Sequence, residues 1–241
     1  MDQAILADLA PTGVLRAAIN MANFLLVTGI APNGDPQGVS PDMAHAVADR
    51  LGVSLALITY SAPGPLADDA GADKWDIGNI GAEAQRAETI AFTAAYCEIE
   101  ATYLVPAGSQ LQSIADVDKP GNRIAVYGRS AYGLRLQRIV KNAELVLTDS
   151  LDSAFETFRD RKLEAYASLR PRLNKDLELL PDARILDGKF SAVEQAIGTP
   201  RKNSAGAAFL REFVEDAKAS GLVAQLIEKH DVDGLSVAPL A

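Results

Sequence analysis

One arginine, Arg86, follows a strand-like apolar segment that contains two glycines. The stretch DIGNIGAEAQRAETIAFTAAY, residues 76–96, passes through this arginine and then returns to apolar residues. A guanidinium offers a rigid, planar fork of N–H donors that matches a carboxylate in bidentate fashion. These residue types indicate a site for a carboxylate brought by a ligand, although an ion pair with Asp76, Glu83 or Glu88 also fits the residues.

A second set of residues could bind an anion at the start of a predicted helix. In NRIAVYGRSAYG, a strand-like run leads to Ser130, Ala131 and Tyr132. The first N–H groups of a helix have no partner within it, and the helix dipole favours negative charge there. Ser130 would cap the helix whether or not an anion binds.

Other catalytic or metal chemistry lacks its residues. The two histidines, His45 and His230, and the single cysteine, Cys97, give no metal-ligand spacing. The acidic, turn-rich segment 61–76 lacks the alternating oxygen ligands and the closing Glu of a calcium loop. No dinucleotide-binding, phosphate-binding or nucleophile-elbow motif is present. We therefore expect no metal and no cofactor, with Cys97 packed in a core strand.

Composition limits the partners. The 241 residues carry a formal net charge of −9, and 48% of them are apolar. This charge disfavours nucleic acid, whose phosphates need Lys and Arg, and it disfavours anionic membranes. No apolar run approaches the ~18 residues of a membrane span, so we expect no membrane insertion. The segment MDQAILADLAPTG carries no secretory signal, which leaves a cytoplasmic protein or a trimmed periplasmic one.

Strands and helices alternate along the chain. Residues 14–19 and residues 53–59 each predict a strand. Between them, GVSPDMAHAVADRLGV predicts a helix, with Ser40 as its N-cap, Pro41 at its first position and Gly52 at its end. This order is a βαβ unit. The later predicted strands are residues 98–106, 122–127, 144–149, 163–168 and 194–200. The later predicted helices are residues 130–143, 150–162, 204–220 and 221–230.

This order of elements, with three local patterns, resembles the family 3 extracellular solute-binding proteins, the periplasmic amino-acid-binding components of ABC importers. The patterns are GVSPDMAHAVADRLGV for a glycine-led helix start, WDIGNIGAEAQRAETIAFTAAY for a segment leading to the arginine, and NRIAVYGRSAYG for a strand and glycine-rich turn. The resemblance spans residues 15–230, and it depends on the order and spacing of all three patterns.

The resemblance implies an α/β, two-lobed fold of the type II periplasmic-binding-protein class with two hinge crossings. Residues 1–104 and 198–241 would form lobe 1, and residues 105–197 would form lobe 2. The crossings would lie near Tyr103–Pro106 and Ala196–Pro200. Ligand binding between the lobes would then close the protein about a hinge.

The resemblance also assigns ligand-binding residues. Arg86 matches the carboxylate-binding arginine, and Gly81 would let the backbone approach the ligand. Ser130, Ala131 and Tyr132 would meet the same carboxylate. The remaining positions follow the first strand, where family members place an acid and a stacking aromatic: Asn20, Asn23 and Phe24.

The chain departs from the family at two positions. Members that bind α-amino acids usually carry an aspartate, which pairs with the ammonium, at the position that aligns with Leu169. Leucine cannot do this, and an unpaired buried ammonium is costly. Either another acid such as Glu83 replaces the aspartate, or the ligand has no α-amino group. The second departure is the stretch between Gly81 and Arg86, which contains Glu83 and is shorter than usual for the family. Arg170 could favour a second acidic group.

Two functions of different classes follow. The first is a non-enzymatic, monomeric solute-binding protein that captures a small carboxylate-bearing ligand and presents it to an ABC transporter permease. The alternative is an enzyme similar to cyclohexadienyl dehydratases, which look like the same fold; there Glu83 would be the candidate general acid.

Overall fold

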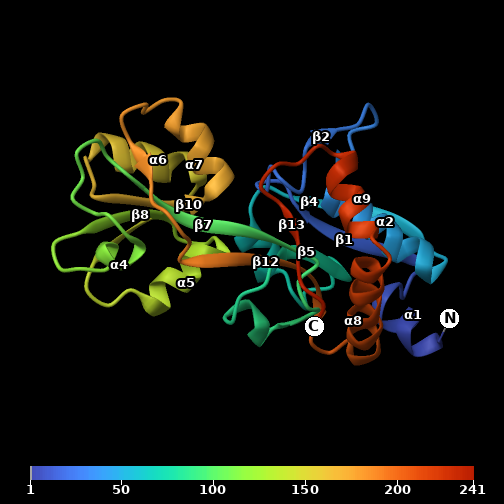
Figure 1. Cartoon of the computed structure of the whole chain (residues 1–241). Helices are drawn as coiled ribbons and strands as arrows, with labels where there is room; N and C mark the ends of the chain where they lie inside the picture. The colour runs from blue at the N-terminus through green and yellow to red at the C-terminus, as the bar shows by residue number, and fades with distance from the viewer. Residues whose placement is uncertain (1) are drawn as a thin grey trace. The chain divides into compact units, whose positions relative to one another are not determined.

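The computed structural model describes residues 2–241, which divide into two compact units. Unit 1 comprises the chain up to Glu98 together with Glu194–Ala241, and unit 2 comprises Ile99–Val193. Two strands continue from one unit into the other, namely β7 (Cys97–Val105) and β12 (Ser191–Pro200) (Figure 1). The lobe boundaries predicted from the sequence, 104/105 and 197/198, stay a prediction.

The sheet of unit 1 is parallel at its centre. β1 (Val14–Asn20) pairs in parallel with β4 (Ser54–Tyr60) on one side and with β5 (Ile77–Gly81) on the other. β12 pairs with β5 in the antiparallel direction, so the strand order in this unit is β4-β1-β5-β12. Because β1 and β5 are buried along most of their length, the carboxyl end of β5 is held rigidly. Gly81, the last residue of β5, lies at that end.

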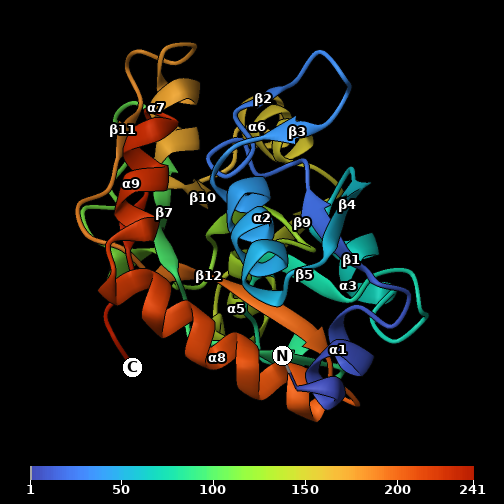
Figure 2. The same ribbon diagram turned by 90° about the vertical axis from the view of Figure 1, so that its right-hand side faces the viewer.

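Helices cover this sheet. α2 (Val39–Leu51) contacts β1 and β4 and lies in front of the strands in Figure 2, whereas α3 (Pro63–Asp68) contributes Leu66 to a cluster with Ala18, Trp75, Ile80 and Ile90. α1 (Gln3–Leu9) packs against α8 (Ser204–Ala219), and α9 (Leu222–Lys229) packs against α2 and α8. The short elements of unit 1 are β2 (Gly29–Ile30), β3 (Pro36–Gln37), the 3-10 helix η1 (Arg86–Glu88), β6 (Ile90–Phe92) and β13 (Ser236–Val237).

Unit 2 has a second α/β sheet, with strand order β7-β10-β8-β9. β10 (Ala165–Leu169) is antiparallel to β7 and parallel to β8 (Arg123–Tyr127), which is parallel to β9 (Glu144–Thr148). The remaining elements are α4 (Ile114–Val117), α5 (Ala131–Ile139), α6 (Leu151–Asp160), α7 (Arg170–Leu177) and β11 (Arg184–Ile185). Phe155, Phe158 and Tyr166 form the aromatic part of its core.

The predicted alternation of strands and helices is confirmed, but the predicted start of α2 is wrong. Its N-cap is Gly38, and Ser40 lies within the first turn. A Cβ on Gly38 would approach the carbonyl oxygen of Leu26 to 2.3 Å, and the Ser40 N–H donates to that same oxygen at 3.0 Å. The close contact with Leu26 therefore requires glycine and sets the helix start. The end at Gly52, in the left-handed conformation, is as predicted.

Candidate functional site

Arg86 lies in a short turn that leaves the end of β5. Arg86 is only 5% exposed, and its Nη1 donates to the carbonyl oxygen of Gly81 at 2.8 Å. The backbone of the turn is fixed as well, because the Thr89 N–H donates to the Arg86 carbonyl oxygen and the Arg201 N–H donates to that of Thr89. The guanidinium is thus a buried, oriented group and not a solvated surface arginine. Gly81 contributes its carbonyl oxygen to this arrangement, and the predicted approach of its backbone to a ligand stays a prediction.

The acids near Arg86 differ in their surroundings. Asp76 binds Arg16, since its carboxylate accepts from the Arg16 N–H at 2.8 Å, Nε at 3.0 Å and Nη2 at 2.7 Å. This carboxylate raises the pKa of Arg16. Glu83 is buried, and one of its oxygens accepts from the Gln85 N–H at 2.7 Å. Of these two acids, Glu83 is the one that lies in the Arg86 turn itself.

The residues after β1 form a tight turn. Asn20 accepts from the Ala22 N–H at 3.2 Å, and the Asn23 side chain accepts from the backbone N–H groups of Leu25 and Leu26. Both asparagines are buried and bind their own loop. Phe24 is 37% exposed. An exposed aromatic ring on a rigid turn is available for stacking, which remains a prediction.

In unit 2, α5 begins at the predicted helix start, and anion binding there stays a prediction. Ser130 is the N-cap; its hydroxyl donates to the Tyr127 carbonyl oxygen at 2.7 Å and accepts from the Gly133 N–H at 2.9 Å. Within residues 2–241 the N–H groups of Ala131 and Tyr132 have no backbone acceptor. The Ser130 hydroxyl is thus used for capping, and the two amides are the groups that could meet an anion.

Gly133 is required by this turn, although the sequence analysis did not select it. A Cβ there would lie 2.1 Å from the Tyr127 carbonyl oxygen. The glycine in GRSAYG was visible in the sequence, but the close contact behind it was not. Tyr132 is buried and lies 3.4 Å from the Ser168 hydroxyl, and burial raises its pKa to about 12. Its phenol therefore stays neutral.

Leu169 ends β10 and is buried, so this position supplies an apolar surface and no charge. Arg170, the next residue, donates from Nε to Glu100 at 2.9 Å and from Nη2 to the Gly188 carbonyl oxygen at 2.6 Å. These contacts give Arg170 a structural role within unit 2, and its hydrogen bond to Glu100 lowers the pKa of that carboxyl.

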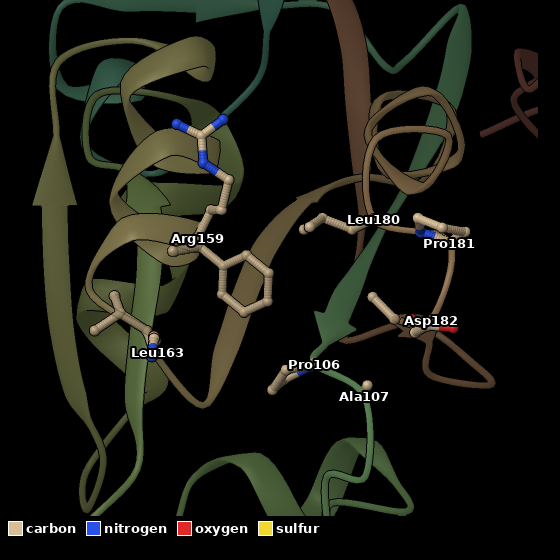
Figure 3. A pocket seen from close by; sticks show the side chains of 10 residues that line it. Pro106, Ala107, Arg159, Leu163, Leu180, Pro181 and Asp182 are labelled. Carbon is tan, nitrogen blue, oxygen red and sulfur yellow. The ribbon is translucent and has the colours of Figure 1, made fainter.

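A separate pocket of unit 2 contains none of the predicted site residues. It has a volume of about 370 Å³, and mostly apolar side chains line it. Figure 3 shows Leu163 on one side and Leu180 and Pro181 on the other, with Pro106 below them. Arg159, at its edge, is paired with the adjacent Asp160 and lies over the Phe155 ring.

Two classes of feature are not found in the described part of the chain. Residues 2–241 contain no group of three or more His, Cys, Asp or Glu side chains arranged to hold a metal ion. Within the same residues, no helix has the length and apolar character that a membrane-spanning helix requires. Cys97 is buried in β7, as predicted, and burial raises the pKa of its thiol well above the usual value.

Solved structures of binding proteins share this fold. One is the binding component of an ABC transporter from Wolinella succinogenes, complexed with lysine: TM-score 0.73, 20% identity, covering 90% of this chain and 95% of the other. Another is the amino acid ABC transporter substrate-binding protein AbpA from Streptococcus pneumoniae, bound to L-arginine: TM-score 0.73, 19% identity, covering 93% and 98%. A third is the ancestral amino acid-binding protein AncCDT-1, a precursor of cyclohexadienyl dehydratase: TM-score 0.72, 18% identity, covering 93% and 98%.

These similarities confirm the predicted mixed α/β fold of the type II periplasmic binding proteins. No curated protein sequence matches the chain. A family model does match: that of the bacterial extracellular solute-binding proteins, family 3, over residues 22–232. Because this match covers most of the sequence, the chain belongs to the bacterial extracellular solute-binding proteins, family 3.

Proposed function

We propose that this protein captures a small carboxylate-bearing ligand, an amino acid or a related organic acid, for import by an ABC transporter. The observation that carries the proposal is the buried guanidinium of Arg86, fixed on the Gly81 carbonyl oxygen at 2.8 Å. Membership of the solute-binding family supports it. So do the lysine and arginine bound by two proteins of the same fold.

Arg86 is suited to bind the carboxylate of the ligand. A guanidinium carries five N–H donors, so a bond from Nη1 to Gly81 is compatible with a bidentate bond from other donors to a carboxylate. Burial strengthens such a bond because the local dielectric constant is low. The rigid turn also reduces the entropy that the arginine loses when the ligand binds.

The amides of Ala131 and Tyr132 are a second proposed anion-binding element. They belong to the first turn of α5, a helix of nine residues, where the helix dipole adds partial positive charge. The Ser130 hydroxyl holds this turn in place through its bonds to Tyr127 and Gly133. Disruption of this helix start should therefore weaken binding of an anion, even though the Ser130 hydroxyl itself bonds to Tyr127 and Gly133 and not to the anion.

The amino group of the ligand, if there is one, needs an acid. Leu169 cannot supply it, and Arg170 is bound to Glu100. Glu83 is the buried acid in the Arg86 turn. We therefore propose Glu83 as the partner of the ammonium in an α-amino acid ligand; a ligand without an amino group is the other possibility that the Leu169 position allows.

The proposed setting is that of the family. The protein would act in the periplasm as a monomer and deliver its ligand to a transporter permease. These points come from the family and from the transporter names of the similar structures.

A thermal-shift screen tests the proposal. The panel should hold the common L-amino acids, their des-amino carboxylic acids and their carboxamides at equal concentration. A ligand that binds only the native state stabilises it by about 2.7 kcal/mol at 100 times its dissociation constant. We expect hits among the carboxylates and none among the matched carboxamides. A hit whose carboxamide binds equally well contradicts carboxylate recognition.

A second candidate function is a lyase reaction of the cyclohexadienyl dehydratase type. The observation that favours it is a buried acid, Glu83, beside a buried arginine, in a fold shared with a precursor of such an enzyme. Incubation with prephenate or arogenate, followed by an assay for the aromatic product, separates the two functions. Turnover that is lost in Glu83→Gln would establish the enzyme, and the absence of product would support the binding protein.

A further inference from the structure

Four buried, uncharged polar side chains of unit 1 leave hydrogen-bonding atoms without a protein partner. The residues are almost inaccessible: Tyr96 is 0% exposed, Ser40 and Asn79 are each 1% exposed, and Gln195 is 3% exposed. Their unbonded atoms are Ser40 Oγ, Asn79 Nδ2 and Oδ1, Tyr96 Oη and Gln195 Oε1. Buried polar atoms in native proteins almost always have a partner, either protein or ordered water.

The strand register brings two of these side chains together. On β5, Ile80 packs with Leu66 of α3, so the alternation of the strand places Asn79 on the opposite face of the sheet. On the neighbouring β12, Gln195 pairs with Gly81. Paired residues point to the same face, and Gly81 is two residues from Asn79. Gln195 is therefore a diagonal neighbour of Asn79, at a spacing of roughly 7–8 Å between backbones.

The other two side chains approach from the start of α2 and from the chain before β7. The Tyr96 N–H donates to the Gln195 carbonyl oxygen at 2.9 Å, which holds Tyr96 beside that residue. The Ser40 hydroxyl lies near enough to the Tyr96 hydroxyl to lower its pKa, but the two oxygens do not meet hydrogen-bond geometry. Burial has the larger effect and raises the pKa of Tyr96, so the phenol stays protonated.

The chemistry of this set decides what it can bind. Ser40, Tyr96 and the Asn79 amide nitrogen offer donors, whereas Asn79 Oδ1 and Gln195 Oε1 offer acceptors. All four side chains are neutral, and the described residues contain no metal-binding group. A bare anion would be repelled by the two amide oxygens, and a bare cation would lack charged ligands. Water both donates and accepts, and it typically needs two to four polar partners.

We propose that Ser40, Asn79, Tyr96 and Gln195 enclose an internal water site behind the carboxyl end of β5, which holds long-lived water whether or not a ligand is bound. The site joins α2 to β5 and β12 through water because no direct bond between these side chains does so. It lies within unit 1 and goes beyond the proposed function, since its occupancy depends on no ligand.

Water-17O magnetic relaxation dispersion on the ligand-free protein tests the proposal, because its amplitude counts long-lived internal waters. The variant is Asn79→Leu, similar in size but without polar atoms. The matched control is Asn203→Leu in the same unit, because Asn203 Nδ2 bonds directly to the Asp8 carbonyl oxygen at 2.9 Å and to Thr199 Oγ1 at 3.0 Å.

We expect Asn79→Leu to lose dispersion amplitude equivalent to at least one water and Asn203→Leu to keep it. We also expect Asn203→Leu to lower the melting temperature more, since it breaks two direct bonds. Equal amplitudes in the wild type and Asn79→Leu would overturn the proposal. If Asn79→Leu does not fold, the wild type still decides: cross-relaxation between the Asn79 side-chain amide protons and water supports the site, and its absence overturns it.

Discussion

Nη1 of Arg86 donates a hydrogen bond to the carbonyl oxygen of Gly81 at 2.8 Å, across the turn that leaves β5. Gly81 is itself fixed, because β5 pairs with β12 from Gly81 to Gly78. The guanidinium is therefore oriented by the sheet and not by solvent. This relationship connects the fold to the proposed carboxylate site, since a fork of donors is specific only when its direction is fixed.

Glu83→Gln should discriminate between two ligand classes. Glutamine keeps an oxygen for the Gln85 N–H but loses the charge that would pair with an ammonium. We expect the variant to bind an α-amino acid ligand roughly tenfold or more weakly and to bind its des-amino analogue as the wild type does. Isothermal titration with both ligands measures this. An equal loss for both ligands would contradict a role of Glu83 in ammonium binding.

Gly133→Ala should destabilise unit 2 at the start of α5. The new Cβ would meet the Tyr127 carbonyl oxygen at 2.1 Å, so the backbone must shift. Overpacking of this kind costs about 1–3 kcal/mol in the free energy of unfolding, which chemical denaturation measures. Gly29→Ala is the control, because its Cβ would make an ordinary 3.5 Å contact with the Gln37 side chain. A similar effect in both variants would show that the contact with Tyr127 is not tight.

Asp42 should make the stability of unit 1 depend on pH in the acid range. Its Oδ2 lies 2.8 Å from Lys229 Nζ and 2.7 Å from His230 Nε2. Burial raises the pKa of this carboxyl, but the hydrogen bonds from Lys229 and His230 outweigh it and hold the pKa below the usual 3.8. The stabilisation is thus complete above about pH 4 to 5 and is lost as the pH falls through the lowered folded-state pKa.

Asp42→Asn measures this contribution. At pH 7 we expect the variant to lose about 1 kcal/mol of unfolding free energy, and we expect the difference from the wild type to shrink below pH 4. Denaturation curves at pH 7, 5, 4 and 3 give both values. A difference that stays constant down to pH 3 would show that Asp42 is not stabilised as a carboxylate.

Local signals in the sequence predict much of this fold. Gly52 ends α2 and Ser150 caps α6, where its hydroxyl accepts from the Ser153 N–H. These motifs act within one or two turns of chain, so the local sequence is enough to identify them. α7 was missed because it begins with Arg170 and Pro171 and has a mostly polar sequence. Its place in the fold depends on distant contacts that only the structure shows: Leu173 packs in the core of unit 2, and Arg172 Nη1 donates to Asp152 of α6 at 2.9 Å.

Contacts between distant residues could not be predicted. Asp76 was one possible partner for Arg86, but in the structure the Asp76 carboxylate bonds to Arg16, on β1. The start of α2 depends on the approach of Gly38 to Leu26. The sequence around Asn79 predicts an ordinary buried strand. Only the structure, with β12 and α2 packed around this strand, shows that the Asn79 amide has no bonding partner. The assignment of Arg86 and the Ala131 and Tyr132 amides to one ligand stays a prediction.

Isothermal titration of Arg86→Lys with the ligand found by the thermal-shift screen tests the central claim most directly. Lysine keeps the charge but replaces the planar fork by a single ammonium, so we expect roughly a 10- to 100-fold loss of affinity, or about 1.4–2.8 kcal/mol. Arg211→Lys, on the exposed face of α8, should bind as the wild type does. If Arg86→Lys is folded and binds the ligand with unchanged affinity, Arg86 does not hold the carboxylate and the account is wrong.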